Sequence, residues 1–257
     1  MFDPELFQAS VERDGFAIIP SLLDVDFVKR CRVQLEDALA AEVRYHGGAD
    51  YPDRDMVLLC SLYGGAFLDL FDNTRLISPF EAVLGPGCTV YAYTSSSMRP
   101  QGSNYSRRVH VDCPRLIPGY VTNVGATILL DDFTEDNGAT FFLPGSHTRS
   151  VAPSEAEFYR GARRLIAPAG TVFFFNARLF HAGGVNSTPN WRHALTINMC
   201  RPFMKQRIDI PRAMAGMDLT KVSENVLQKL GFRAQVPASY AEYYAPLDQR
   251  PYSQPVE

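Results

Sequence analysis

Short runs of Val, Thr, Tyr and Phe recur between residues 88 and 205, and Gly, Pro, Asn and Asp separate them. Short β-prone runs at this spacing are typical of the strands of an all-β sandwich or barrel. The runs that we expect to form strands cover residues 89–95, 107–112, 121–130, 140–143, 171–175, 180–181 and 192–200. The fold is therefore predicted to be mainly β.

The first 85 residues favour helices instead. Asp24 is placed to cap a helix, and Gly47 and Gly48 are placed to end it. Its apolar side chains recur close to the helical period of 3.6 residues, at Val28, Cys31, Leu35, Leu39 and Val43. Shorter helices are expected over residues 4–13, 65–71, 79–84 and 220–230, and after the capping pair Ser154 and Glu157.

These patterns predict one domain over residues 1–257. Its helical part would cover about 1–85, its β core about 88–205, and a C-terminal helix and tail 206–257. The late tyrosines Tyr240, Tyr243 and Tyr244 would either cover the mouth of a cavity or pack on the barrel.

Composition excludes several classes of function. The 257 residues carry 25 Lys and Arg against 28 Asp and Glu, and a nucleic-acid-binding domain usually shows a basic excess. No apolar run approaches the ~18 residues of a membrane span, and the acidic start of the chain is unlike a signal peptide. The five cysteines are scattered and form no CxxC pair, which is typical of a reducing cytoplasm. We therefore expect a cytoplasmic protein that binds neither nucleic acid nor membranes.

A candidate metal site begins with His110 and Asp112. On a strand, residues two apart share a face, so both side chains would point into one pocket. The simplest alternative is a hydrogen-bonded surface pair. His181 follows an apolar run and Arg192 lies eleven residues later, across a turn-rich segment that suits a hairpin. Two histidines and a carboxylate suit a non-haem Fe(II) oxygenase, and Arg192 offers a planar fork to the far carboxylate of a 2-oxo acid.

A longer pattern surrounds these residues. His110-x-Asp112 is followed by Asn137-Gly138-Ala139-Thr140, Pro144-Gly145-Ser146-His147, His181 and Arg192. In this order and spacing they resemble the phytanoyl-CoA dioxygenase family of Fe(II)/2-oxoglutarate oxygenases. The likeness covers residues 88–205, with a weaker part at 13–24. It implies a double-stranded β-helix, which is a cupin-like jelly roll flanked by helices. It also implies that His110, Asp112 and His181 bind iron and that Arg192 binds the C5 carboxylate of 2-oxoglutarate.

Two positions depart from the family pattern. Thr127 stands where the family often has Trp, and Gly183 stands where it often has Ser. Thr127 and Thr140 are therefore expected to supply hydroxyl groups to the cosubstrate. By strand alternation, Thr196 and Asn198 share the face of Arg192. His147 is expected to make a structural hydrogen bond, and His193 to pack outside.

These observations together predict an Fe(II)- and 2-oxoglutarate-dependent dioxygenase that uses O₂ to hydroxylate, or otherwise oxidise, a small organic molecule. Arg108, Arg115 and Tyr105 lie in the segment around His110 and are the candidate substrate contacts. They favour an anionic amino acid or natural-product intermediate, with an apolar natural product as an alternative. Asp112 fills the position that related halogenases leave open for chloride, which argues against halogenation. Two other functions stay open: a jelly-roll metal enzyme that needs no 2-oxo acid, such as an isomerase, and a non-catalytic binding module. The oligomeric state is left open.

Overall fold

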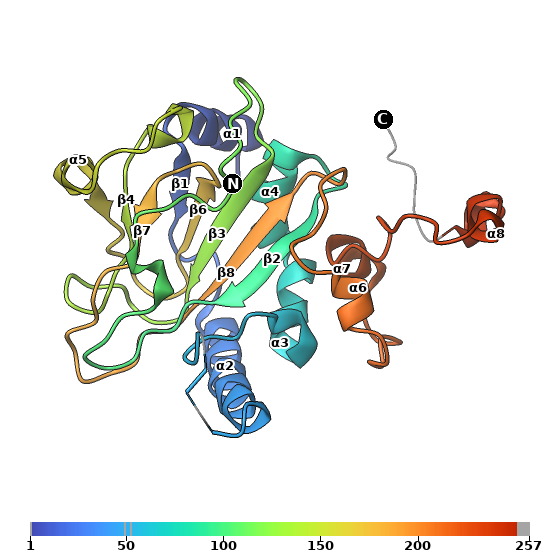
Figure 1. Ribbon diagram of the computed structural model, residues 1–257, viewed down its shortest axis with the longest axis horizontal. Coiled ribbons are helices and arrows are strands. Elements are labelled where there is room, and N and C mark those ends of the chain that lie inside the picture. The colour runs from blue at the N-terminus through green and yellow to red at the C-terminus, as the bar shows by residue number, and fades with distance from the viewer. Residues whose placement is uncertain (1, 49, 52, 251–257) are drawn as a thin grey trace.

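Two antiparallel sheets form the centre of the computed structural model, which describes residues 2–48, 50, 51 and 53–250 (Figure 1). Within these residues the larger sheet has the strand order β1 (Phe16–Ile19), β6 (Val172–Asn176), β3 (Asn123–Leu129), β8 (Ala194–Cys200) and β2 (Thr89–Ser95). The smaller sheet has the order β5 (Arg163–Arg164), β4 (Phe141–Phe142) and β7 (His181–Ala182). The predicted strand 89–95 is thus confirmed to the residue.

The larger sheet is apolar on both faces, and the two faces have different partners. In β3, Val124, Ala126 and Ile128 belong to a core that the sheet shares with the helices. Leu129 belongs to a second core on the opposite face. Because side chains alternate along a strand, Asn123, Gly125 and Thr127 share the face of Leu129. This face looks toward the smaller sheet and forms the inner wall of the barrel.

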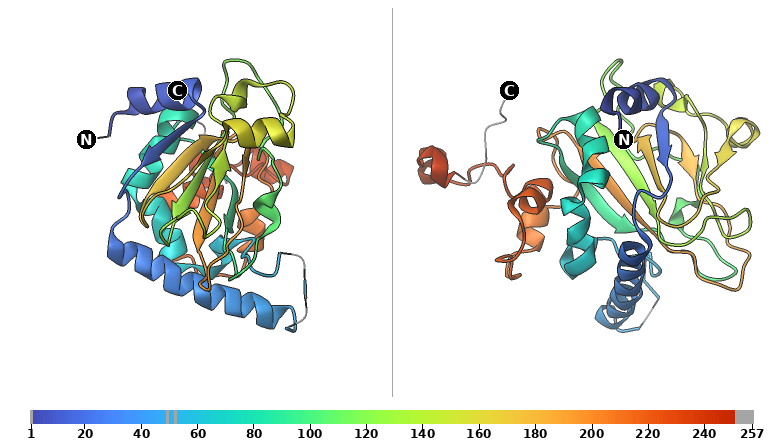
Figure 2. Two further views of the ribbon diagram at one scale, coloured as in Figure 1. Left: turned by 90° about the vertical axis from the view of Figure 1, so that its left-hand side faces the viewer. Right: turned by 180° about the vertical axis from the view of Figure 1, so that it is seen from behind.

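Helices cover the outer face of the larger sheet, as two further views show (Figure 2). Asp24 caps α2 by accepting a 2.8 Å hydrogen bond from the backbone N–H of Phe27, as expected. The helices among the described residues are α1 (Pro4–Arg13), α2 (Val25–Tyr45), α3 (Gly65–Asp69), α4 (Thr74–Leu84), α5 (Glu155–Gly161), α6 (Ile210–Ala213), α7 (Glu224–Lys229) and α8 (Tyr240–Tyr243). Short 3₁₀ turns are η1 (Cys60–Tyr63), η2 (Leu70–Asp72), η3 (Tyr105–Arg107), η4 (Ser146–Thr148) and η5 (Leu247–Gln249).

The helix predicted over residues 79–84 begins earlier than expected. Asn73 caps α4 by accepting hydrogen bonds from Arg75 N–H and Leu76 N–H. Pro79, where the predicted helix begins, is a residue type that suits the first turn of a helix. It lies inside the helix instead, where its missing N–H forfeits one backbone hydrogen bond. Burial of the apolar face of α4 offsets that loss.

The C-terminal segment leaves the barrel beside β2. Lys229 of α7 is buried and its Nζ lies 2.6 Å from Glu81 Oε1, which ties α7 to α4. Beyond it, α8 projects away from the barrel (Figures 1 and 2), and Tyr240, Tyr243 and Tyr244 are exposed. Both expectations for these tyrosines are therefore wrong. Among the described residues, no helix combines the length and the apolar character that a membrane span requires.

Candidate active site

His110 and His181 are brought together by the backbone. Their N–H and C=O groups exchange two 3.0 Å hydrogen bonds, which form one isolated bridge. The two imidazole centroids lie 4.2 Å apart as a result. The predicted strand 107–112 is wrong, because η3 (Tyr105–Arg107) turns the chain and the two-residue strand β7 offers too short an edge for a ladder. The side chains of His110 and Asp112 nevertheless meet.

One oxygen of Asp112 faces both imidazoles. Its Oδ1 lies 3.7 Å from Nε2 of His110 and 3.7 Å from Nε2 of His181. A ligand atom of each of the three residues lies within 4.8 Å of the other two. The structure therefore brings together the three ligands that the sequence predicted.

The protonation of the two histidines suits metal binding. Nδ1 of His110 lies 2.7 Å from the Arg108 carbonyl, and Nδ1 of His181 lies 2.9 Å from the Leu179 carbonyl. A carbonyl oxygen only accepts, so each Nδ1 carries a proton, and in the neutral imidazole Nε2 is then the atom with the free lone pair. Burial and the neighbouring imidazole of His181 lower the pKa of His110, which favours its neutral form. Two imidazole nitrogens and one carboxylate oxygen fit an Fe(II) site with open positions.

Arg192 lies just before β8 and is 1% exposed. Its Nη1 donates to the Ser96 carbonyl at 3.0 Å and its Nη2 to the Gly138 carbonyl at 3.3 Å. Its guanidinium carbon lies 4.3 Å from the centroid of the Phe133 ring. Among the described residues no carboxylate lies within 4.0 Å of it, and its buried Nε has no hydrogen-bond partner. Burial lowers the pKa of Arg192 to about 10. A buried cation of this kind is suited to an anionic ligand.

Comparison with known protein families assigns the chain to one of them. The family model of phytanoyl-CoA dioxygenase (PhyH) matches residues 11–194. The chain belongs to the phytanoyl-CoA dioxygenase family. The jelly roll that the sequence predicted is therefore confirmed by the two antiparallel sheets and by a similar solved structure, AviO1 from Streptomyces viridochromogenes. AviO1 matches with a TM-score of 0.63 at 22% identity, over 80% of this chain and 98% of AviO1.

Two relatives illustrate how far the sequence similarity extends along the chain. The uncharacterized protein Rv1501 of Mycobacterium tuberculosis is 27% identical over 246 residues, which cover 93% of this chain and 90% of Rv1501. The dioxygenase FUM3 of Gibberella moniliformis is 30% identical over 126 residues, which cover 47% of this chain and 40% of FUM3. The family, together with the relatives that are named dioxygenases, supports an oxygenase of the dioxygenase type.

The departure from the family pattern at Gly183 has a structural cause. The backbone N–H of Gly183 donates to the Ser106 carbonyl at 2.7 Å, so the two segments are in close contact. A Cβ added at Gly183 would press against Ser106 Oγ and would lie 2.8 Å from Met98 Cε. A serine side chain at 183 would therefore require the Ser106 hydroxyl and the Met98 methyl group to move.

The two expected threonines occupy different parts of the barrel. Thr127 lies on the inner face of β3, directly opposite Thr196 of β8. Thr140 precedes β4 and lies two residues from Gly138, whose carbonyl accepts from Arg192. Their role as cosubstrate contacts stays a prediction.

The three candidate substrate residues do not gather at one place. Tyr105 lines a cavity of about 470 Å³ while 56% of its surface stays exposed. Partial desolvation against the cavity wall, together with the carboxylate of Asp112, raises the pKa of its phenol. Arg115 lines a different cavity, of about 320 Å³, together with Tyr120. Arg108 is exposed, and its carbonyl orients His110. A single anion site built from Arg108 and Arg115 is therefore not formed.

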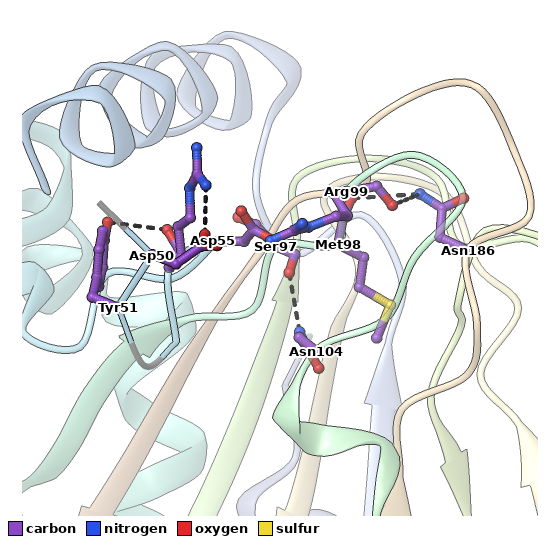
Figure 3. A network of polar contacts seen from close by, with 9 residues as sticks. Asp50, Tyr51, Asp55, Ser97, Met98, Arg99, Asn104 and Asn186 are labelled. Atoms are coloured by element: carbon purple, nitrogen blue, oxygen red, sulfur yellow. Dashed lines mark hydrogen bonds and ion pairs between the residues drawn. The ribbon is translucent and has the colours of Figure 1, made fainter. Parts of the chain in front are cut away.

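The segment 97–99 separates the barrel interior from the cavity beside Tyr105. Figure 3 shows it held on both sides by polar contacts. On one side Arg99 pairs with Asp55. On the other side the Asn186 side chain donates to the Arg99 carbonyl at 3.0 Å. Asn104 Nδ2 donates to the Ser97 carbonyl at 3.0 Å, which fixes the start of the loop leading to His110.

His147 and His193 make structural contacts away from the metal cluster. His147 has its Nε2 2.9 Å from the Glu12 carbonyl, as expected for a structural hydrogen bond. His193 packs on the outer side of the barrel, as expected, and it is buried there, with 3% of its surface exposed. Its Nδ1 lies 2.9 Å from Ser97 Oγ, and its backbone N–H donates to Asp131 at 2.8 Å. Alternation turns His193 away from Arg192 to the outer face, and it is buried because α2 and Asp131 cover that face.

One residue beside the site was missed. Asn123 begins β3, faces the inside of the barrel and donates to Asn198 at 3.1 Å. Its signal in the sequence is an amide side chain inside the apolar run 121–130, where a buried polar group needs a partner.

Proposed function

We propose that this chain is an Fe(II)- and 2-oxoglutarate-dependent oxygenase that hydroxylates a small organic molecule. The observation that carries the proposal is the pairing of two features in one barrel. The first is the cluster of His110, Asp112 and His181, with both Nε2 atoms free to bind a metal. The second is Arg192, a buried guanidinium without a carboxylate partner among the described residues.

The overall reaction would convert R–H, 2-oxoglutarate and O₂ into R–OH, succinate and CO₂. Ferrous iron held by the two histidines and Asp112 would supply the activation of O₂ and a site that the oxo acid can chelate. The chain's own residues position the reactants. Arg192 would bind the far carboxylate of 2-oxoglutarate through its fork of N–H donors. The apolar inner wall, with Phe173, Phe175 and Leu129, would exclude water and strengthen that charged contact.

The substrate is proposed to be a small molecule rather than a nucleic acid or a membrane. Arg115 supports an anionic group on it. Its side chain is exposed beside the cavity of about 320 Å³, and among the described residues no carboxylate lies within 4.0 Å of it. Tyr105 supports a polar contact in the other cavity. A single oxygenase domain is part of the same proposal.

Two measurements test the proposal. The first is anaerobic titration of the metal-free protein with Fe(II) and then 2-oxoglutarate, followed by the visible charge-transfer absorbance of the chelate. The second is release of succinate in air, with and without a panel of anionic amino acids and natural-product acids. We expect the absorbance to appear only when both are present, and succinate release to require O₂.

The outcomes separate the alternatives. Metal binding with turnover that needs neither O₂ nor 2-oxoglutarate would favour an isomerase-like metal enzyme. Failure to bind Fe(II) or Mn(II) would favour a non-catalytic binding module. Either result would overturn the proposed function.

A further inference from the structure

The two oxygens of Asp112 have different partners. Oδ1 faces the Nε2 atoms of His110 and His181 at 3.7 Å each. Oδ2 points the other way and accepts a hydrogen bond from Asn198 Nδ2 at 3.3 Å. The contact with Asn198 therefore engages the oxygen that the metal cluster does not use.

The orientation of Asn198 is fixed by a second amide. A carboxylate only accepts hydrogen bonds, so Asn198 must turn its NH₂ group toward Asp112. Its Oδ1 then needs a donor, and Asn123 Nδ2 supplies one at 3.1 Å. The reverse orientation of Asn198 would place oxygen against oxygen at Asp112 and would leave two NH₂ groups facing each other. The polar contacts thus run from Asn123 through Asn198 to Asp112.

The fold places the two amides in adjacent positions. Asn123 belongs to β3 and Asn198 to β8, which are hydrogen-bonded neighbours. Both side chains lie on the inner face of the sheet, and they are 1% and 4% exposed. Little water reaches them, so the protein's own groups determine how each amide points.

Packing alone does not explain this pair. The buried Oδ1 of Asn123 has no hydrogen-bond partner, which is unfavourable. The neighbouring residues of the same strands, Val124 and Met199, are apolar and fully buried at no such cost. An unsatisfied buried amide beside a candidate metal ligand points to a positioning role.

We infer that Asn198, oriented by Asn123, is a positioning residue for Asp112. It holds the carboxylate so that Oδ1 alone is offered to the metal, while Oδ2 stays engaged. A carboxylate that gives one oxygen leaves the remaining coordination positions for the cosubstrate and O₂. The inference rests on the proposed function in one respect, namely that His110, Asp112 and His181 bind a metal.

Mn(II) binding to the metal-free protein tests the inference without any turnover. The free Mn(II) signal is followed by electron paramagnetic resonance in the wild type, Asn198→Leu, Asn123→Leu and the double variant. Met199→Leu is the matched control, since Met199 lies next to Asn198 on β8 but faces the helices. Circular dichroism and thermal unfolding of each metal-free variant establish that it is folded.

Loss of a group that orients a metal ligand typically weakens metal binding 10- to 100-fold. We expect Asn198→Leu to raise the Kd for Mn(II) by about 10- to 100-fold, Asn123→Leu to raise it less, and Met199→Leu to leave it unchanged. Because both amides act through one hydrogen bond to Asp112, the double variant should bind no more weakly than Asn198→Leu alone. A purely structural role would lower the thermal stability of the folded variants but would leave their Kd for Mn(II) unchanged.

The possible results distinguish this inference from the proposed function. A wild-type protein that fails to bind Mn(II) contradicts the metal site itself. A wild type that binds Mn(II) while folded Asn198→Leu and Asn123→Leu bind it equally well overturns the positioning role alone. If Asn198→Leu does not fold, Asn123→Leu decides, because it leaves Asn198 and Asp112 in place. Effects of the two substitutions that simply add would also overturn the inference.

Discussion

Replacing Arg192 by Ala separates the binding of 2-oxoglutarate from the chemistry at the metal. Arg192 lies fully inside the barrel, and its guanidinium reaches only two backbone carbonyls, those of Ser96 and Gly138. Neither carbonyl carries a full charge, and Asp131 acts on the buried cation only from a distance, without an ion pair among the described residues. A bound dicarboxylate would supply that charge, and the Ala variant would lose it.

The size of the effect follows from the type of contact. A hydrogen bond to a charged group contributes about 1.5–3 kcal/mol, and each tenfold change in affinity corresponds to about 1.4 kcal/mol. Arg192→Ala should therefore raise the KM for 2-oxoglutarate by about 10- to 150-fold. Arg192→Lys keeps the charge but loses the planar fork, so its KM for 2-oxoglutarate should lie between that of the wild type and that of Arg192→Ala. The kcat at saturating 2-oxoglutarate should change less than KM, because the contact is made in the ground state too.

The assay is succinate release against 2-oxoglutarate concentration, at fixed Fe(II) and substrate. Arg201→Lys is the control, because the Arg201 guanidinium also binds backbone carbonyls, those of Val121, Leu84 and Val83, but on the far side of the sheet. Its KM should equal that of the wild type. A KM for Arg192→Ala within twofold of the wild-type value would refute the assignment of Arg192.

Three other predictions follow from the site. Asp112→Ala should abolish both Mn(II) binding and turnover, and unchanged turnover would remove Asp112 from the ligand set. Gly183→Ala should lower the free energy of unfolding by about 1–3 kcal/mol through overpacking against Ser106; adding Ser106→Ala should restore part of it, and denaturant unfolding measures both. Burial holds the pKa values of His110 and His193 below the usual ~6.5. As the pH falls, the unfolded chain therefore binds protons at these histidines before the folded chain does. The metal-free protein should therefore lose stability as pH falls below about 6.5, and a Tm that does not fall between pH 7.5 and 5, or an undiminished slope in His193→Gln, would contradict this.

The parts of the fold that the sequence predicted best are those governed by local rules. The strand 89–95 and the helix 4–13 form over the expected residues, because alternation and capping act within a few neighbours. The prediction of a strand over 107–112 was wrong for a non-local reason. Its partner β7 has only two residues, so no ladder forms even though the residues are β-prone. The predicted start of α4 was wrong because burial of the helix's apolar face outweighs the backbone hydrogen bond that is lost at Pro79.

For the site too, the sequence predicted what depends on residue type and spacing, and missed what depends on the path of the folded chain. Residue type and spacing predicted which of the residues would meet, since His110, Asp112 and His181 do converge. The sequence offered Arg108 and Arg115 as candidate substrate contacts but could not say which cavity each would reach, because the path of their segment depends on what it packs against. The role of Asn123 could not be found from spacing, since its partner lies 75 residues away on a strand whose register only the fold sets.

Strand β8 shows why so many of these functions converge on one segment. Its odd-numbered residues Leu195, Ile197 and Met199 face the helices and belong to the main core. Its even-numbered residues Thr196 and Asn198 face the inside of the barrel. Arg192 lies just before the strand begins, and Asn198 contacts Asp112 further along it. Alternation thus divides one strand into a stabilising face and a functional face. Truncation at an odd position should therefore lower the free energy of unfolding, by about 2–5 kcal/mol for Leu or Ile to Ala. Truncation at an even position should alter metal or cosubstrate binding at a smaller cost in stability.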